Sequence, residues 1–182
     1  MAAKPLPSPE VLRQLLNYDP ETGKLFWKER PVEMFASESH CKTWNTRYAC
    51  KEAGRLKYDG YVIVRIFGHD YRGHRVAWAV HCGRWPHEGM DIDHVNLLRS
   101  DNRIANLREA TRSQNKMNQP AHADSMSGLK GISRCLRDNK WKAHIQISGK
   151  RTFLGRFQTP EEAHEAYRRA SEQVHGEFSR AS

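Results

Sequence analysis

The sequence has few cysteines, no long apolar run and too few acidic residues to balance its basic ones. Its four cysteines stand far apart and form no Cys-x-x-Cys pair (Cys41, Cys50, Cys82 and Cys135). This pattern argues against a zinc ribbon and against a dense disulfide framework, and it favours four free thiols in a reducing cytosol. No apolar run approaches the roughly 20 residues that span a bilayer, and the first ten residues lack the apolar core of a signal peptide. We therefore expect a cytoplasmic protein that does not enter a membrane.

The excess of basic over acidic residues is the most informative feature of the composition. Thirty lysines and arginines stand against 21 aspartates and glutamates, which gives a formal net charge of +9. Such a balance favours a polyanionic partner, but many basic proteins bind no nucleic acid, so charge alone leaves the partner open. With 182 residues, 38% of them hydrophobic, the chain is long enough for one domain or for two small ones with modest cores.

Residues 1–53 have a pattern that predicts a short helix followed by a strand. Ser8 and Pro9 fit the N-cap and the first position of a helix, and apolar residues recur along one face of the turns that follow. A turn then leads into residues 24–28, Lys-Leu-Phe-Trp-Lys, which have the composition of a strand. Residues 31–52 are polar and show no clear period.

A hairpin and a helix are predicted next. Residues 55–67 read RLKYDGYVIVRIF and predict two strands that turn at Asp59-Gly60. Residues 75–80 are apolar at helical spacing, and Gly83 supplies a signal for the end of a helix.

Residues 90–118 contain the highest density of chemically useful side chains. An apolar stretch over residues 90–95 predicts a strand that contains Asp93 and His94, and a polar loop follows it. Residues 104–107 are expected to return as a second strand, after which Thr111 caps a short helix. The predicted outline is strand, loop, strand and helix.

This outline brings together groups suited to phosphodiester hydrolysis, which needs a base to activate water and a rigidly bound cation to stabilise negative charge. Asp93 is a hard oxygen ligand for Mg²⁺ or Mn²⁺, and Asn115 on the helix offers an amide oxygen. His94 suits the general base because an imidazole titrates near neutral pH. Neighbours in a regular strand face opposite sides, so the strand must end or bend if Asp93 and His94 serve one site.

The same residues resemble the HNH nuclease motif, or ββα-metal fold, in the form common in phage and intron-encoded endonucleases. In that family an Asp-His pair supplies a metal ligand and then the base, which correspond to Asp93 and His94. The middle asparagine, which ties the loop to the strand, corresponds to Asn106, twelve residues on, and the last metal ligand to Asn115, nine further. The sequence of residues 101–107 is itself typical of the phage branch of the family. The resemblance implies a homing-type DNA endonuclease that uses Mg²⁺ or Mn²⁺, with tight Zn²⁺ binding disfavoured.

The segment from His74 to Trp78 also resembles the stretch that precedes the motif in these phage proteins. Two roles for His74 stay open at this point. The imidazole either contacts a DNA phosphate or packs beneath the site.

The part of the chain after residue 127 has its own pattern. Residues 119–127 contain almost no bulky apolar side chain and are the best linker candidate. Residues 128–157 contain eight lysines and arginines and a single acid. From Trp141 to Ile147, polar and apolar side chains alternate as in a strand with one buried face.

A helix is expected to cover that apolar face. Thr159 and Pro160 begin a capping box, and an apolar stripe at helical spacing follows. The uncovered face of the sheet can then enter the major groove of DNA. We expect that face to present the DNA-binding residues Arg134, Lys142, His144, Gln146, Arg151 and Phe153.

Residues 128–180 resemble the Apetala-type (ethylene-response-factor) DNA-binding domain, which is found fused to phage-type HNH nucleases. The residues that carry the resemblance are Gly131-Ile132, Trp141 to Ile145, Phe153 to Phe157, and Glu161 to Tyr167. His144 and Gln146 stand where plant members often have Glu and Arg, so no recognition sequence can be carried over.

Together these patterns predict an α+β protein with four regions: a helix and strand region at 1–53, a nuclease module at 54–118, a linker at 119–127, and a DNA-binding module at 128–182. We expect a monomer that binds double-stranded DNA and takes no small-molecule substrate. The alternative from another class is a non-catalytic DNA-binding regulator that keeps an HNH scaffold. A structure-selective or RNA-directed nuclease and a packaging or host-takeover accessory are further alternatives.

Overall fold

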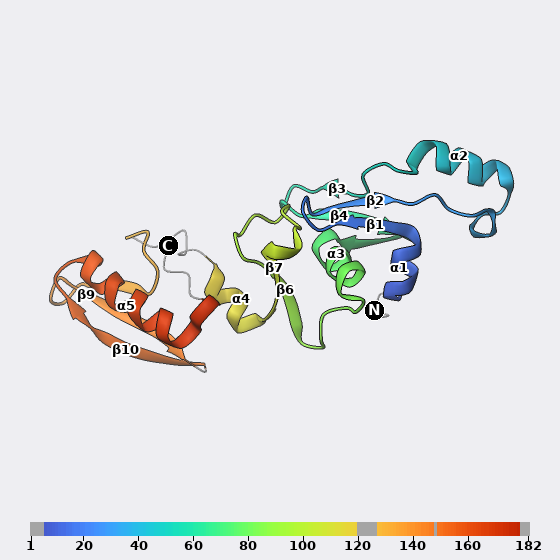
Figure 1. The fold of residues 1–182 in the computed structure, drawn as a ribbon. Coiled ribbons are helices and arrows are strands. Elements are labelled where there is room, and N and C mark those ends of the chain that lie inside the picture. The colour runs from blue at the N-terminus through green and yellow to red at the C-terminus, as the bar shows by residue number, and fades with distance from the viewer. Residues whose placement is uncertain (1–5, 120–126, 148, 179–182) are drawn as a thin grey trace. The chain divides into compact units, whose positions relative to one another are not determined.

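The computed structural model describes residues 6–119, 127–147 and 149–178. The chain divides into two compact units, Met1–Ala110 and Thr111–Ser182, and each is described by itself (Figure 1). This division falls inside the region expected at 54–118 and assigns the helix after Thr111 to the second unit. Most of the expected linker, from 120 to 126, lies outside the described residues. Among the described residues, no helix is both long and apolar enough to cross a membrane.

The first unit is a mixed α/β structure. Its helices are α1 (Pro9–Leu15), α2 (Glu38–Tyr48), α3 (Gly73–Cys82) and the short 3-10 helices η1 (Val32–Met34) and η2 (Ile104–Asn106). Its strands are β1 (Leu16–Asp19), β2 (Lys24–Trp27), β3 (Arg55–Leu56), β4 (Val62–Ile66), β5 (His69–Arg72), β6 (Met90–His94) and β7 (Leu107–Thr111). β1 pairs with β2, β4 pairs with both β3 and β5, and β6 lies beside β7.

Two predicted helices of this unit form where their end signals place them. Ser8 caps α1, its side chain accepting from the backbone N of Val11 at 3.3 Å. α3 ends at Gly83, whose φ of 71° is a left-handed conformation that glycine adopts without a steric penalty. The predicted hairpin also forms, with β3 and β4 as its antiparallel strands.

The core of the first unit joins α1 and α3 to the strands that flank them. It contains fully buried residues from α1, β1, β4 and α3, namely Leu12, Leu15, Leu16, Val64, Ile66, Val76 and Ala79. A smaller cluster of Ala77, Ile92 and Leu107 joins α3 to β6 and β7. Burial of these side chains fixes the end of β6 relative to α3, which positions the residues described below.

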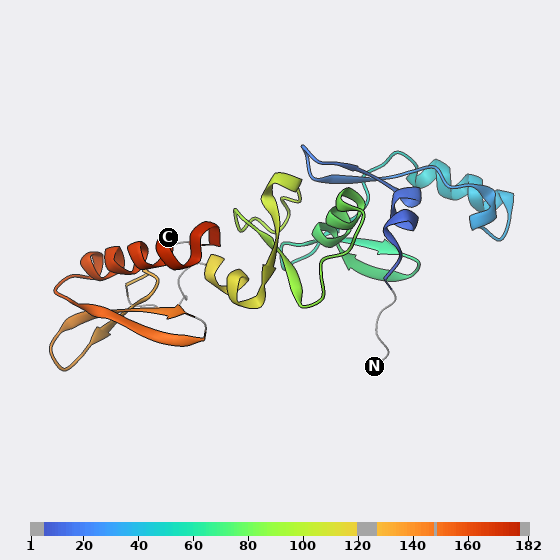
Figure 2. The ribbon, with the colours of Figure 1, turned by 60° about the horizontal axis from the view of Figure 1, so that its bottom comes forward.

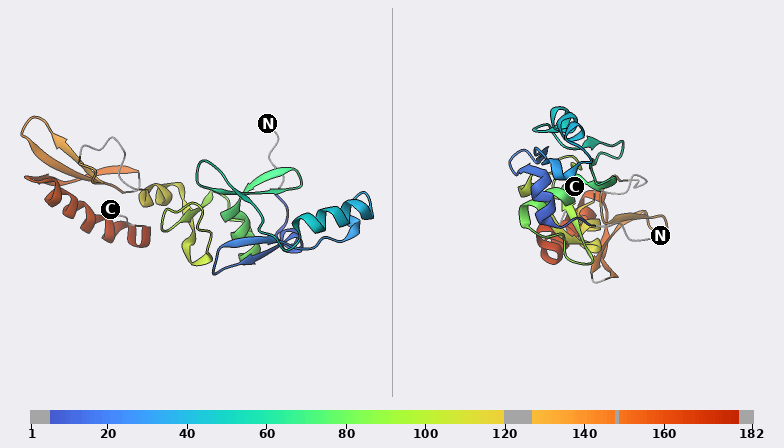
Figure 3. Two further views of the ribbon diagram at one scale, coloured as in Figure 1. Left: turned by 90° about the horizontal axis from the view of Figure 1, so that it is seen from above. Right: turned by 90° about the vertical axis from the view of Figure 1, so that its right-hand side faces the viewer.

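Residues 31–52, which show no clear period, contain α2. The helix has no buried residue. Instead Trp44 contacts the rings of Trp27, Phe35 and Tyr48, and the Arg30 guanidinium lies 3.8 Å from the Trp44 ring centroid. Figure 3 shows α2 at the end of the first unit away from β6 and β7. Aromatic and cation–π contacts thus hold α2 in place of a buried apolar stripe. The sequence of α2 therefore shows no hydrophobic period that would predict a helix.

The second unit is a three-stranded antiparallel sheet with helices. Its elements are α4 (Arg112–Asn118), β8 (Ile132–Cys135), β9 (Lys140–Ile147), β10 (Lys150–Phe157), α5 (Pro160–His175) and η3 (Gly176–Phe178). The strand order is β10–β9–β8, and α5 lies along one face of the sheet (Figure 2). Ala143 and Ile145 of β9 are buried with Ala163 and Tyr167 of α5. The predicted strand from Trp141 to Ile147 and the helix that covers its apolar face are therefore observed.

Two predicted elements differ in the structure. Residues 104–106 form η2 rather than a strand, and the returning strand is β7, which begins at Leu107. The apolar stripe predicted after Pro160 extends to Val174 at helical spacing, but Val174 is 44% exposed because it lies in the last turn of α5, beyond the buried residues. Thr159 does form the predicted capping box with Glu162.

Candidate functional site

The end of β6 brings Asp93 and His94 into a buried environment. Both side chains are at least 95% buried, and β6 ends at His94, so the alternation of a regular strand stops where the two groups lie. From β7, Arg108 donates to Asp93 Oδ2 through Nε at 3.1 Å and through Nη2 at 3.0 Å. A buried carboxylate is thereby paired with a guanidinium, as such burial requires.

The ring of His94 is oriented by a side chain from the following loop. Its Nε2 lies 3.2 Å from Oδ1 of Asn102. Because an amide oxygen only accepts, Nε2 carries the hydrogen, and in the neutral ring Nδ1 carries the lone pair. Burial lowers the pKa of His94, an effect that the hydrogen bond to Asn102 opposes. His94 is therefore mainly in the neutral, basic form at neutral pH.

Asn102 was not among the residues expected from the sequence. Its side chain is 97% buried, and its backbone carbonyl accepts from the hydroxyl of Tyr18 at 2.7 Å, which ties the loop to β1. In the sequence it lies in a polar turn, where asparagine is common for purely local reasons. Only its contact with His94, eight residues away, distinguishes it from a turn residue.

Asn106 joins the two ends of the same loop. Its Oδ1 accepts from the backbone N of Asn96 at 2.9 Å, and its Nδ2 donates to the backbone O of Asp101 at 2.8 Å. Asp101 also accepts from Nδ2 of Asn96 at 2.7 Å. The loop after β6 is thus closed by side-chain hydrogen bonds at both ends.

His74, on α3, lies against His94. The two ring centroids are 4.9 Å apart in a T-shaped arrangement, and the ring of Tyr61 lies 5.3 Å from that of His74. Burial and then the proximity of His94 lower the pKa of His74 to about 3. Among the described residues, Nδ1 of His74 is buried and has no hydrogen-bond partner. A neutral, buried ring in this position favours packing beneath His94 over contact with a phosphate.

Two guanidinium groups lie around Tyr61, next to these histidines. Arg72 and Arg99 lie 4.2 and 5.1 Å from the Tyr61 ring centroid. The carboxylate of Asp59 accepts from Arg72 at 2.8 Å, which lowers the pKa of Asp59, and the backbone O of Asp59 accepts from Arg99 at 3.0 Å. These residues come from β5, the turn before β4 and the loop after β6, so sequence spacing gives no sign of the cluster.

Asn115 lies on α4, in the second unit. Thr111 and Gln114 form a capping box that fixes the start of this helix, and Asn115 is half-buried. The described part of the chain contains no group of three His, Cys, Asp or Glu residues that could bind a metal. Asp93 lies in the first unit and Asn115 in the second, so their use as ligands of one Mg²⁺ or Mn²⁺ ion stays a prediction.

The sheet face of the second unit that α5 leaves uncovered presents polar side chains. Lys142, His144 and Gln146 alternate with the buried residues of β9, and the register pairs Gln146 with Arg151 and His144 with Phe153. Cross-strand partners share a face, so these five residues lie together. Arg151 Nη2 is 3.4 Å from His144 Nδ1, and the His144 and Phe153 rings are 5.3 Å apart.

Arg134 does not join that face, contrary to expectation. Its register partner is Trp141, so it lies on the side of the sheet that α5 covers, and Ser133 is the β8 residue opposite Lys142. The Arg134 side chain donates from Nε to Oδ1 of Asn139, at 3.1 Å, in the β8–β9 turn. A shift of one residue in the register of a strand moves every side chain to the other face of the sheet. The sequence of β8 has no alternation of polar and apolar residues strong enough to specify its register.

One family of known proteins is similar to the region that contains these residues. Residues 71–117 match the model of the HNH endonuclease family. This part of the chain is therefore similar to HNH endonucleases, and it contains Asp93, His94, Asn102, Asn106 and Asn115. The match ends before β8, so the resemblance of residues 128–180 to the Apetala-type domain stays a prediction.

Two individual proteins are similar to the chain. Protein 3.8 of Escherichia phage T7 is 29% identical over 109 residues, which cover 60% of this chain and 88% of the phage protein. A solved structure titled "DNA binding and cleavage by the HNH homing endonuclease I-HmuI" is 19% identical and has a TM-score of 0.39, with 88% of this chain and 84% of that chain covered. A TM-score of that size does not establish a shared fold.

Proposed function

We propose that the protein is a divalent-metal-dependent endonuclease that hydrolyses phosphodiester bonds in duplex DNA. The observation that carries the proposal is the state of His94 within the region that is similar to HNH endonucleases. The ring is buried beside Asp93, its pKa is lowered, and Asn102 accepts from Nε2, so that Nδ1 is the basic atom. A histidine in the free-base form near neutral pH, in a fixed tautomer, is what a general base requires.

In the proposed reaction Nδ1 of His94 takes a proton from water, and the resulting hydroxide oxygen attacks phosphorus. The bond between phosphorus and one sugar oxygen breaks, and that oxygen leaves with the electron pair and is protonated afterwards. Asp93 and Asn115 would bind the divalent cation, which stabilises the negative charge on the phosphate and the leaving oxygen. Arg108 orients the Asp93 carboxylate, and Asn106 maintains the loop that contains Asn102.

The groups around Tyr61 support a phosphate at this site. Arg72 and Arg99 place two permanent positive charges next to the ring that contacts His74 and His94. Guanidinium groups recognise phosphate through parallel hydrogen bonds, and they remain charged at any physiological pH. We assign His74 to orienting the His94 ring from beneath.

The second unit is proposed to bind duplex DNA through the uncovered sheet face. Lys142, His144, Gln146 and Arg151 supply the donors and acceptors that read base edges, and Phe153 supplies an exposed apolar surface. The Apetala-type resemblance supports this use of the sheet. We also propose a phage origin, which the similarity to a phage protein supports.

A plasmid assay tests the proposal. Supercoiled DNA is incubated with the protein in Mg²⁺, in Mn²⁺ and in EDTA, beside Asp93→Ala and His94→Ala. His69→Ala is the matched control, because His69 is an exposed histidine on β5 away from this cluster. We expect metal-dependent conversion to nicked circle that both site variants lose and the control keeps. DNA that is bound but stays intact in every condition would instead support a non-catalytic regulator.

A further inference from the structure

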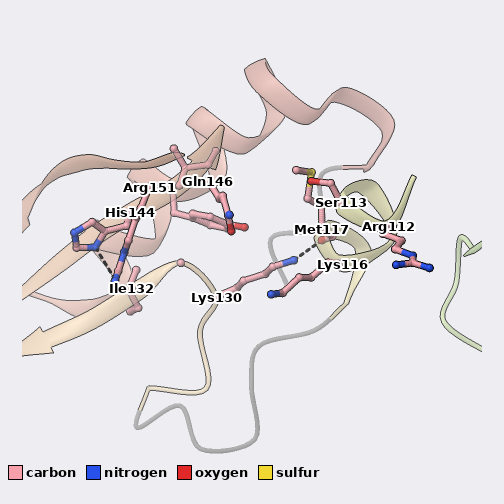
Figure 4. Close-up of a pocket in the computed structure, with 12 residues that line it drawn as sticks. Arg112, Ser113, Lys116, Met117, Lys130, Ile132, His144, Gln146 and Arg151 are labelled. Atoms are coloured by element: carbon pink, nitrogen blue, oxygen red, sulfur yellow. Dashed lines mark hydrogen bonds between the residues drawn. The ribbon is translucent and has the colours of Figure 1, made fainter. Parts of the chain in front are cut away.

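A groove in the second unit lies between α4 and the open edge of β9 (Figure 4). β8 begins at Ile132, opposite Ala143, so β9 continues past the start of its neighbour and leaves the strand edge near Ile145 and Gln146 uncovered. α4 borders this edge from the other side, and the groove between them encloses about 740 Å³.

The lining of the groove is strongly basic. Four of its side chains are cations, Arg112 and Lys116 from α4, Lys130 before β8, and Arg151 from β10. His144 and Gln146 of the uncovered sheet face also reach it, and none of the residues that line it is acidic. The groove is therefore continuous with the proposed DNA-binding face and extends its positive charge onto α4.

Specific contacts build the floor of the groove. Nζ of Lys130 donates to the backbone O of Met117 and, at 2.8 Å, to the backbone O of Gln119, and so binds the last carbonyls of α4. Gly131 has a φ of 77°, and a Cβ there would lie 2.0 Å from the Tyr167 ring, so only glycine allows the chain to pass this close to α5. Lys130 thus uses its charge within the fold, and Arg151 lies 3.4 Å from His144 Nδ1.

Arg112 and Lys116 are exposed, and in the described part of the chain neither forms an ion pair with a carboxylate. They stand four residues apart, so they lie on one side of α4 and repel each other. This contrasts with α5, where Arg168 and Arg169 are both paired with Glu165. An unneutralised pair of like charges beside a basic groove points to an anionic ligand.

We propose that this groove binds the sugar–phosphate backbone of duplex DNA. The inference rests on the proposed function, because that function makes DNA the ligand. The cations other than Lys130 come from α4 and β10 and do not converge on one point (Figure 4), which suits successive phosphates along a strand and not a single small anion. Contacts of this kind position a protein on DNA without reading its sequence.

The location of the groove links binding to cleavage. Arg112 and Lys116 flank Asn115 in the seven residues of α4. The helix that would supply a metal ligand would therefore also bind the DNA backbone next to the C-terminal sheet. Backbone contacts through α4 would position the second unit on the DNA while its sheet face reads the sequence.

The test measures DNA affinity of the full chain in EDTA, where no cleavage occurs, over a series of salt concentrations and with duplexes of unrelated sequence. The variant is Arg112→Gln with Lys116→Gln. The matched control is Arg168→Gln with Arg169→Gln, which removes the same charge from residues that already have carboxylate partners. If both groove cations contact phosphates, the slope of log affinity against log salt falls by about 1.8 and affinity at 0.1 M salt falls about 60-fold. The loss should be equal for all duplexes, and the control should leave the slope unchanged.

Each other outcome overturns a defined part of the inference. An unchanged slope, with thermal unfolding also unchanged, means that the groove does not contact DNA. A loss confined to one duplex sequence means that the two residues read bases, and a loss seen only with single-stranded DNA or RNA means that the ligand is wrong. If the protein does not cut plasmid but the variant shows the expected slope change, DNA binding by the groove is supported and the proposed nuclease activity is rejected. If the protein cuts plasmid but the variant leaves the slope unchanged, the nuclease activity is supported and DNA binding by the groove is rejected.

Discussion

The polar groups around His94 differ from those along the groove of the second unit in burial and in their partners. Asp93, His94 and Asn102 are buried, and each interacts with a defined neighbour. Arg112, Lys116 and Arg151 are exposed, and none of them forms an ion pair with a carboxylate among the described residues. Burial beside hydrogen-bonding partners fixes the geometry and the pKa of a catalytic side chain. An exposed cation without a carboxylate partner keeps its charge available to bind a polyanion. Variants in the two regions should therefore change different measured quantities.

His94→Ala should give the largest effect. Removal of a general base is expected to lower the cleavage rate about 10²- to 10⁴-fold, while DNA affinity measured in EDTA stays within about twofold. The groove variant Arg112→Gln with Lys116→Gln should show the opposite pattern, with weaker affinity and a nearly unchanged rate at saturating DNA. Comparing the rate and the affinity for both variants checks this. If His94→Ala also lowered DNA affinity, the groups around His94 would contribute to DNA binding as well as to cleavage, and the two roles could not be assigned to separate regions.

Asn102→Leu should have a smaller effect on the same rate. Without the acceptor for Nε2, His94 is expected to populate both tautomers, and loss of an orienting partner of this kind typically costs 10- to 100-fold. Nitrogen chemical shifts of the His94 ring report the tautomer directly. Asn102→Asp keeps an acceptor in place and is the control, in which the Nε2–H form should persist. A lower rate with an unchanged tautomer would reduce Asn102 to a purely structural role.

The difference between the regions also decides what the sequence could predict. Asp93, His94, Asn106 and Asn115 follow fixed spacings along one segment, so their pattern could be recognised before the fold was known. Asn102, Arg72 and Tyr61 could not, because their contact with the histidines depends on how β4, β5 and the loop after β6 pack together.

In the second unit the strands and α5 followed from alternation and from the Thr159 capping box. The face of Arg134 did not, because it depends on a strand register that β8 does not specify. Local patterns thus predicted most of the helices and strands, whereas tertiary packing decided the strand register and the contacts between distant segments.

Acidification should destabilise the first unit through His74. The folded pKa of about 3 lies below the unfolded value of 6.5, so below pH 6.5 the unfolded chain binds a proton that the folded chain does not. The free energy of unfolding therefore falls as pH decreases through this window, by about 1.6 kcal/mol between pH 6.5 and 5. Chemical denaturation across this range should show a shallower pH dependence for His74→Gln. The exposed His69 supplies the comparison, and if His69→Gln flattened the curve equally, burial of His74 would not be the cause.

Thr159→Ala should have the smallest effect, and it tests whether the second unit depends on packing or on its helix cap. The Thr159 side chain accepts from the backbone N of Glu162 at 3.2 Å, and the Glu162 carboxylate accepts from the backbone N of Thr159 at 3.4 Å. Loss of the hydroxyl removes one of these bonds at the start of α5 and should lower stability by about 1 kcal/mol. Thr159→Ser keeps the acceptor and should behave as the parent protein in thermal unfolding. Because α5 covers only the buried face of the sheet, DNA affinity at 25 °C should not change in either variant. A loss of affinity in Thr159→Ala alone would mean that the exposed face depends on the helix behind it, and the two faces of this sheet would then be coupled.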